Sequence, residues 1–173
     1  MARPTVAAIC QYTNDEEYAI QLFGQAFYEV KRLHRLGVGL PSFVMSDTKK
    51  GLALLALEKK LAVLSNNISG VRNLLDIEQI TDYFDDMIIS EEVAVAKPNQ
   101  EIFKIALKRM GVTPDEAIMV GDRIDSDIVP AKKIGMKTVL IKSVTFSNKI
   151  SNSDERIPDI ICTDLLELAR III

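Results

Sequence analysis

Three short segments of this 173-residue chain combine side chains that could bind an anion or a metal ion. The first, Ser65-Asn66-Asn67, directly follows the apolar run Leu61-Ala62-Val63-Leu64. A hydroxyl and an amide at the end of a buried strand can hold a phosphoryl oxygen, assisted by nearby backbone N–H groups. Ser65 and Asn66 are therefore candidate substrate-binding residues, and a helix cap is the alternative interpretation of this segment.

The second segment is Lys97-Pro98, which opens a predicted helix. The residue before a proline is restricted to extended backbone conformations, so Lys97 is held on a defined main chain. A lysine held in this way can neutralise a carboxylate and a phosphate that share one site, which makes Lys97 a candidate catalytic residue. A solvated surface lysine is the alternative.

The third segment places two acids after the apolar run Ala117-Ile118-Met119-Val120-Gly121. Asp122 would stand at the tip of a strand, and Asp127 would follow in the first helical turn. Two carboxylates at this spacing suit Mg²⁺, which prefers oxygen ligands and keeps several waters. Asp122 and Asp127 are therefore the candidate metal ligands. Capping of the next helix by Asp125 or Ser126 is the alternative.

The elements that must position these segments alternate along the chain. Continuous apolar runs, typical of strands buried on both faces of a parallel sheet, cover 61–64, 87–89, 117–120, 137–141 and 160–161. Helical patterns cover 48–59, 99–110, 126–134 and 163–170. This alternation predicts an α/β fold with a Rossmann-like, doubly wound parallel sheet over residues 46–173. Ligands of such sheets bind at the carboxyl ends of the strands, where all three segments fall.

The first 45 residues have a different pattern. Thr5 to Tyr12 is apolar but rich in alanine, and Asp15 to His34 repeats apolar residues on one helical face. We predict two helices here, rather than a strand and a crossover, and interpret residues 1–45 as a partial helical cap. His34 is expected on a solvated basic face of that cap.

Composition excludes several classes of protein. The net charge of −3 and the pI near 5.3 indicate no general affinity for nucleic acid or for an anionic membrane. The two cysteines, Cys10 and Cys162, lie far apart and form no CxxC pair, which excludes a disulfide framework and a cysteine-rich zinc site. No apolar run is long enough for a transmembrane helix or a signal peptide, so we expect a cytoplasmic protein.

In their order and spacing, the three segments resemble the second, third and fourth motifs of the haloacid dehalogenase (HAD) superfamily of hydrolases. The resemblance covers residues 46–170, and the stretches Ile88-Ile89-Ser90-Glu91-Glu92-Val93 and Gly135-Met136-Lys137-Thr138-Val139 look like the branch with a helical cap. It implies an Mg²⁺-dependent phosphatase that acts on a small phosphorylated metabolite through an aspartyl-phosphate.

The resemblance also implies a role for each candidate residue. Ser65 would bind the phosphoryl group, and Lys97 would hold the nucleophile and the phosphate together. Asp122 would ligate Mg²⁺, and Asp127 would support the metal site directly or through water.

The first motif of the family, Asp-x-Asp after an apolar strand, supplies the nucleophile and the general acid–base, and it has no match here. Thr5–Cys10 is followed by Gln11-Tyr12-Thr13, and Asp47 is followed two positions later by Lys49 rather than by an acid. A late start of the chain is the simplest explanation. As written, the chain is predicted to have little or no phosphatase activity.

Loss of that central strand would leave a gap between the strands that begin at Leu61 and Ala117. Residues 4–10 could fill the gap as a strand, a partner chain could fill it, or the strand order could change. The unpaired sheet edges would favour a homodimer.

Whether the chain is an enzyme stays open. A non-catalytic binding or regulatory module that retains a phosphate and Mg²⁺ pocket is one alternative. A haloacid dehalogenase-like hydrolase is another, although the acids at Asp122 and Asp127 favour the metal-dependent phosphatases. A receiver-like signalling domain would need a phosphorylatable Asp at the end of a central strand, and none is found.

Overall fold

The computed structural model describes residues 5–8, 46–142 and 157–173. The chain divides into two compact units, one made of Met1–Gln11 with Ser46–Ile173 and the other of Tyr12–Met45. The second unit lies outside the described residues, together with the helix and the basic face predicted there.

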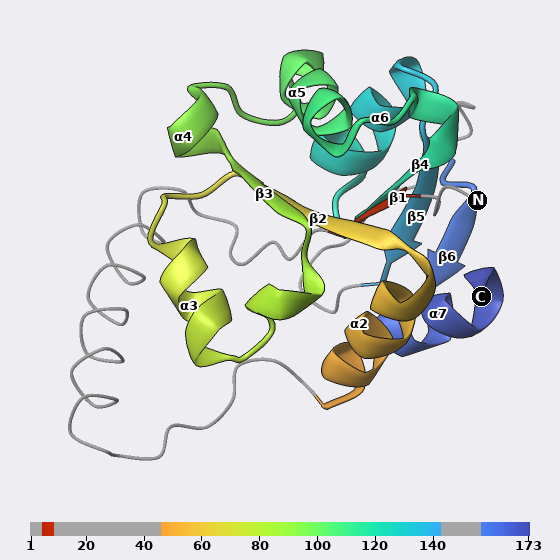
Figure 1. Cartoon of the computed structure of the whole chain (residues 1–173). Helices are drawn as coiled ribbons and strands as arrows, with labels where there is room; N and C mark the ends of the chain where they lie inside the picture. The colour runs from red at the N-terminus through yellow and green to blue at the C-terminus, as the bar shows by residue number, and fades with distance from the viewer. Residues whose placement is uncertain (1–4, 9–45, 143–156) are drawn as a thin grey trace. The chain divides into compact units, whose positions relative to one another are not determined.

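A single sheet of six parallel strands forms the centre of the first unit, in the order β3-β2-β1-β4-β5-β6 (Figure 1). The interior of the sheet is apolar on both faces, and in β2 every residue after Lys60 is buried. The five strands predicted from apolar runs are confirmed. The strand bounds are β1 Thr5–Ala8, β2 Lys60–Ser65, β3 Asp86–Ile89, β4 Ala117–Gly121, β5 Lys137–Ile141 and β6 Ile160–Cys162.

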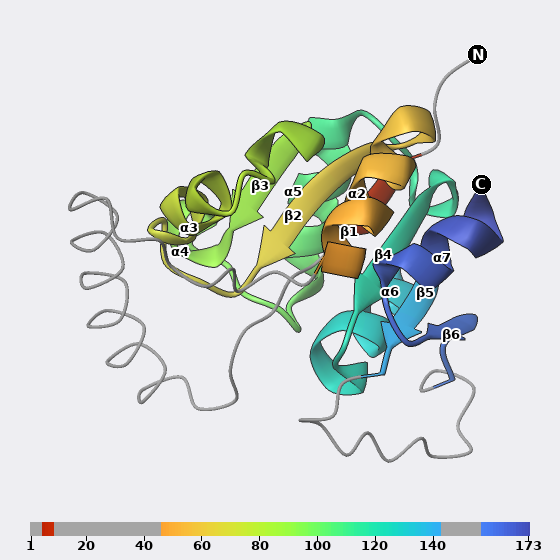
Figure 2. The same ribbon diagram turned by 90° about the horizontal axis from the view of Figure 1, so that it is seen from below.

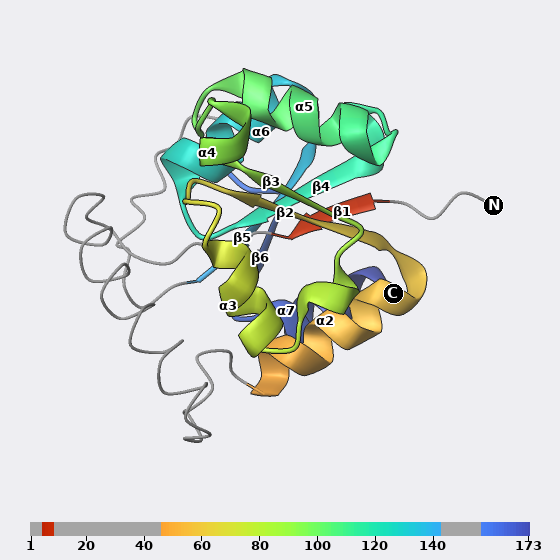
Figure 3. The ribbon, with the colours of Figure 1, turned by 60° about the vertical axis from the view of Figure 1, so that its left-hand side comes forward.

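Helices cover both faces of the sheet, which makes a three-layer α/β/α arrangement (Figure 3). On one face lie α4 (Ser90–Val93), α5 (Gln100–Met110) and α6 (Val129–Lys133). On the other lie α2 (Ser46–Glu58), α3 (Val71–Ile77) and α7 (Leu165–Ile172), and α2 and α7 pack side by side (Figure 2). Short helical turns complete the chain at η1 (Thr81–Tyr83), η2 (Pro114–Glu116) and η3 (Ile124–Ile128).

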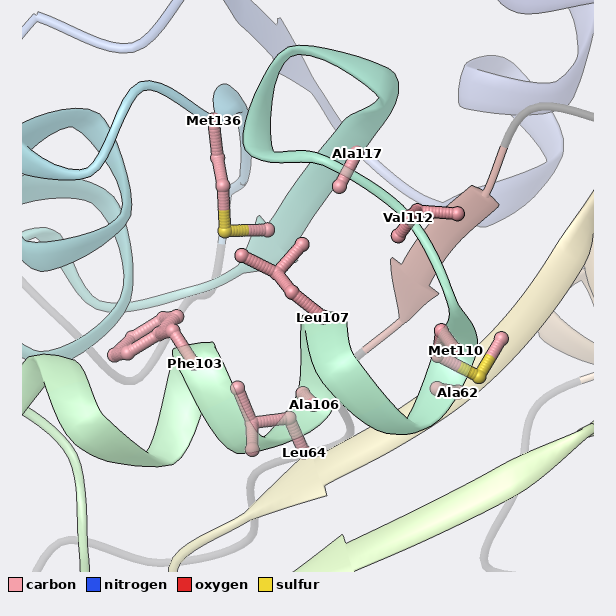
Figure 4. A pocket seen from close by; sticks show the side chains of 9 residues that line it. All are labelled: Ala62, Leu64, Phe103, Ala106, Leu107, Met110, Val112, Ala117 and Met136. Carbon is pink, nitrogen blue, oxygen red and sulfur yellow. The ribbon is translucent and has the colours of Figure 1, made fainter.

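Helix α5 shows how the sequence sets these elements. The side chain of Asn99 accepts a hydrogen bond from the backbone of Glu101 and so caps the amino end, and Gly111 ends the helix in the left-handed conformation at φ 68°. The apolar stripe between them packs on the sheet and leaves one small cavity without polar lining (Figure 4). The cavity is lined by Ala62, Leu64, Phe103, Ala106, Leu107, Met110, Val112, Ala117 and Met136.

The prediction of a helix at Thr5 to Tyr12 is wrong for Thr5–Ala8, because these four residues form β1. Strand β1 pairs in parallel with both β2 and β4, so backbone hydrogen bonding on both sides outweighs the low strand preference of Ala7 and Ala8. Residues 5–8 therefore fill the central gap as a strand, which is one of the three possibilities expected from the sequence. Because β2 and β4 both pair with β1, they offer no unpaired edge at this point for the predicted homodimer.

Two further details differ from the sequence prediction. The helix predicted from Ser126 begins at Ile124, as the π-helical turn η3, before α6 continues it. Helix α3 was not predicted, and its amino end at Gly70 has no side-chain cap. Within the described ranges, no helix combines the length and the apolar character needed to cross a membrane.

Candidate active site

The three predicted segments meet at the carboxyl edge of the sheet, around β1. Ser65 is the last residue of β2, Asp122 directly follows β4, and these two strands flank β1. In register, Ala8 stands beside Val63 and Val120, so Ser65 and Asp122 each lie two residues beyond the described end of β1. Strands β2 and β3 lie on one side of β1, and β4, β5 and β6 lie on the other, so the direction of strand addition reverses at β1. Open α/β sheets bind ligands at such switch points.

Lys97 and Asp127 form an ion pair inside the protein. The Lys97 Nζ lies 2.8 Å from Asp127 Oδ1, and both side chains are 0% exposed. The alternative of a solvated surface lysine is therefore excluded. Burial of two charges costs several kcal/mol per ion, on the order of the attraction between them, so such a pair is weak evidence for stability and fits a functional site better.

The carboxylate of Asp127 is fixed by three donors. Besides Lys97, the backbone N–H of Arg123 donates to Oδ2 at 3.0 Å and the hydroxyl of Ser126 lies 3.3 Å from Oδ1. The π-helical turn creates this geometry, because it folds Asp127 back over Arg123. Neither Asp125 nor Ser126 caps the turn, so the capping alternative does not account for this segment.

Gly121 allows the carboxylate to approach the strand. A Cβ atom added at Gly121 would lie 2.5 Å from Asp127 Oδ2 and 2.6 Å from its Cγ. Any other residue would therefore push Asp127 away from the end of β4. The glycine in the Gly-Asp pair is needed for space at this position.

Asp122 is half-buried beside this pair. Burial raises the pKa of the Asp122 carboxyl, and the negative charge of Asp127 raises it further. A cation at this point would offset both effects. No cluster of three or more His, Cys, Asp or Glu side chains that could hold a metal ion occurs within the described residues, so such a cation would need oxygen ligands from water or from a bound anion.

Ser65 supplies a buried hydroxyl to the same edge. Its side chain is fully buried, and its Oγ has no hydrogen-bond partner among the described residues. A buried hydroxyl without a partner is costly in a folded protein unless a ligand uses it. The helix-cap alternative does not apply to Ser65, because α3 begins at Val71 after Gly70.

The two asparagines after Ser65 bond to protein groups. The Asn66 side chain bonds twice to the main chain of Lys97, whereas the Asn67 side chain accepts from the backbone of Ile68. The backbone N–H of Asn67 donates to the hydroxyl of Ser90, so it is not among the nearby N–H groups that could assist phosphoryl binding. Gly121 and Ser90 thus belong to the support of the site, a role that the sequence analysis, which named both only within longer stretches, did not assign to them.

Comparison with known proteins agrees with this geometry. Residues 94–168 match the family model described as HAD-hydrolase-like. A glyceraldehyde 3-phosphate phosphatase from Methanocaldococcus jannaschii is 36% identical over 141 residues, which cover 80% of this chain and 60% of that protein. One from Pyrococcus furiosus is 39% identical over 107 residues, 62% of this chain and 44% of that protein. The chain thus spans less than two thirds of either relative.

Solved structures show the same fold. A HAD phosphatase from Thermococcus onnurineus superposes with a TM-score of 0.68 over 96% of both chains at 23% identity. The fold, the order of the motifs and these matches together support a hydrolase of the haloacid dehalogenase superfamily. The resemblance inferred from the sequence is confirmed at this level. The roles of Ser65, Asn66, Lys97, Asp122 and Asp127 remain predictions.

Proposed function

We propose that the chain binds the phosphoryl group of a small phosphorylated metabolite, as the core of a HAD-like phosphatase. The observation that carries this proposal is the buried Lys97–Asp127 pair, which Asn66 joins to the loop that follows the buried hydroxyl of Ser65. Lys97 supplies a positive charge and Ser65 a donor, both at the carboxyl edge of the sheet. The named relatives support the same class of substrate, because they are glyceraldehyde 3-phosphate phosphatases.

Asp122 would hold Mg²⁺ together with the phosphate. When bound, Mg²⁺ would neutralise charge on the phosphoryl oxygens and hold them in place. A single half-buried carboxylate suits this ion, which is commonly held by one or two carboxylates and by substrate phosphates. Asp127 would act beside Asp122 by fixing Lys97 and by adding negative charge.

The residues present can bind and orient a phosphate, but they do not provide a carboxylate nucleophile. The residues after β1 are Ile9-Cys10-Gln11, which lie outside the described residues, and the first acid after β1 is Asp15. Lys97 would therefore stabilise charge without a carboxylate to attack the phosphorus. We propose that this chain has little or no phosphatase activity, and that it works as a non-catalytic binding or regulatory module unless a nucleophile is supplied. A cytoplasmic location remains part of this proposal.

Hydrolysis of p-nitrophenyl phosphate by the 173-residue chain tests the proposal, with Mg²⁺ and with a chelator. The matched control is Asp122→Asn, which keeps the size of the side chain and removes the charge proposed to hold Mg²⁺. We expect the rate of the unchanged chain to equal that of the variant. Chelator-sensitive turnover that Asp122→Asn abolishes would contradict the proposed inactivity and mean that the chain contains a nucleophile.

A further inference from the structure

Asn66 bonds to the main chain of Lys97 through both ends of its side-chain amide. The Asn66 Nδ2 group donates to the Lys97 carbonyl oxygen at 2.8 Å, and the Lys97 N–H donates to Asn66 Oδ1 at 2.7 Å. This pairing copies the two hydrogen bonds that neighbouring strands exchange. It joins two loops that are 31 positions apart in the sequence.

Lys97 is consequently held at both ends. Asn66 fixes its main chain, and Asp127 fixes its ammonium group at 2.8 Å. A lysine side chain has a flexible four-carbon stem, so an ion pair at the tip does not by itself place the charge. Fixing the main chain as well restricts the ammonium to one region, next to the carboxylate of Asp127.

Hydrogen bonds to its backbone hold the loop that carries Lys97. It runs from the end of α4 at Val93 to the cap of α5 at Asn99, and within it the N–H of Asn99 donates to the carbonyl of Ala96. Asn66 links this short turn to the residue that follows Ser65. The loop after β2 thus sets the position of Lys97 relative to the hydroxyl of Ser65.

We propose that Asn66 is a positioning residue that acts through Lys97, in place of the direct contact with substrate expected from the sequence. This inference rests on the proposed function, because it assumes that Lys97 and Ser65 bind one phosphate. The amide of Asn66 holds the Lys97 backbone so that the ammonium and the Ser65 hydroxyl face the same anion. Loss of the amide would leave the fold intact and weaken binding of the anion.

Calorimetric titration of the full chain with inorganic phosphate in the presence of Mg²⁺ tests the inference. We expect Asn66→Ala to weaken phosphate binding about tenfold, because the loss of both hydrogen bonds to the Lys97 main chain releases the ammonium from its position. Asn67→Ala is the matched control, because that side chain accepts from the backbone N–H of Ile68 and makes no hydrogen bond to Lys97 within the described residues. The control should bind phosphate within about twofold of the unchanged chain.

The ¹⁵N signal of the Lys97 ammonium is a readout that a merely structural role of Asn66 would not move, because Asn66 bonds to the main chain of Lys97 and the ammonium bonds to Asp127. In the unchanged chain the Lys97 backbone N–H should exchange slowly with solvent, and its side-chain ammonium should give a resolved, slowly exchanging ¹⁵N signal. Asn66→Ala should speed the backbone exchange and broaden the ammonium signal while the thermal midpoint stays well above the measuring temperature. Asn66→Gln, which keeps the polarity but moves the amide, serves if Asn66→Ala does not fold.

The two proposals fail in different ways. If the unchanged chain binds no phosphate, the proposed function fails. The magnetic resonance signals of the Lys97 backbone N–H and ammonium still test the role of Asn66. If the unchanged chain binds phosphate and the folded Asn66 variant binds it equally, with unaltered Lys97 signals, the positioning role is overturned and the proposed function stands.

Discussion

The buried charges of Lys97 and Asp127 are acceptable only as a pair. Each side chain is 0% exposed, and each compensates the charge of the other. When one partner of such a pair is removed, the remaining charge stays buried without compensation. Exposed pairs behave differently, because water already solvates both of their charges.

We therefore expect Asp127→Ala to lower the free energy of unfolding by about 3–5 kcal/mol, measured by urea denaturation. Exchanging both residues for apolar ones, in Lys97→Met with Asp127→Leu, should recover most of this loss. Lys50→Ala is the control, because Lys50 pairs with Asp47 on the surface, and it should cost less than about 1 kcal/mol. An Asp127 variant as stable as the Lys50 variant would contradict the account of the pair.

A second prediction at the scale of single residues concerns Gly121. Gly121→Ala would place a Cβ atom 2.5 Å from Asp127 Oδ2, so the carboxylate must move or the strand must shift. We expect a loss of about 1–3 kcal/mol in the free energy of unfolding, together with a longer Lys97–Asp127 distance in a crystal structure. Unchanged stability with an unchanged ion pair would show that the space at Gly121 is not needed.

At the scale of elements, side chains tie the loops after β2 and β3 together. Ser90 bonds to the backbone of Asn67, and Glu91 accepts from the N–H of Ser69. Arg72 on α3 reaches both Glu92 on α4 and the carbonyl of Met87 on β3. Because these contacts include the Arg72–Glu92 ion pair, the stability that they give to the fold should depend on pH.

The Arg72–Glu92 pair predicts a dependence of stability on pH. The hydrogen bond from Arg72 lowers the pKa of Glu92 below its ordinary value of 4.5. A lowered pKa in the folded state means that the pair stabilises the fold above pH 4.5 and that this contribution is lost as the pH falls below it. Glu92→Gln should therefore show a smaller fall in thermal midpoint than the unchanged chain between pH 5 and pH 3. Parallel pH curves for the two proteins would contradict this assignment.

Gly51 controls how closely α2 approaches α7. A Cβ atom at Gly51 would lie 2.5 Å from the backbone carbon of Leu165, so the two helices would have to separate. We expect Gly51→Ala to destabilise the fold by about 1–3 kcal/mol in urea, despite the better helix preference of alanine. Leu57→Ala on the exposed side of α2 is the control, and it should stay within about 0.5 kcal/mol. A Gly51 variant that is stabilised would contradict the close approach.

The sequence predicted elements well where their own residues carry the pattern. The apolar runs of β2 to β6 and the capped, amphipathic α5 are of this kind. Strand β1 could not be predicted in this way, because its four residues are rich in alanine and owe their conformation to pairing with strands more than 50 positions away. Helix α3 has only seven residues and no side-chain cap, so it gives no local signal.

For the molecule as a whole, the sequence predicted which residues gather at the carboxyl edge of the sheet. It did not predict their partners, because these come from loops that only the fold brings together. Asn66 meets Lys97 across 31 positions, and Asn67 meets Ser90 across 23. The space that Gly121 leaves for Asp127 likewise depends on the π-helical turn, which has no sequence signature here.

The central claim is that Ser65 and Lys97 form a binding site for a phosphoryl group. The buried hydroxyl of Ser65 has no described partner, so Ser65→Ala should leave the free energy of unfolding unchanged or raise it slightly. The same hydroxyl is proposed to donate to phosphate, so its removal should weaken binding. A residue that matters for binding and not for stability is the signature of a site.

The most direct test is calorimetric titration of inorganic phosphate, with Mg²⁺ present, into the unchanged chain and into Ser65→Ala. The account predicts binding by the unchanged chain, at least about tenfold weaker binding by the variant, and a thermal midpoint of the ligand-free variant equal to or slightly above that of the unchanged chain. No binding by the folded, unchanged chain, or equal binding by both proteins, would contradict it.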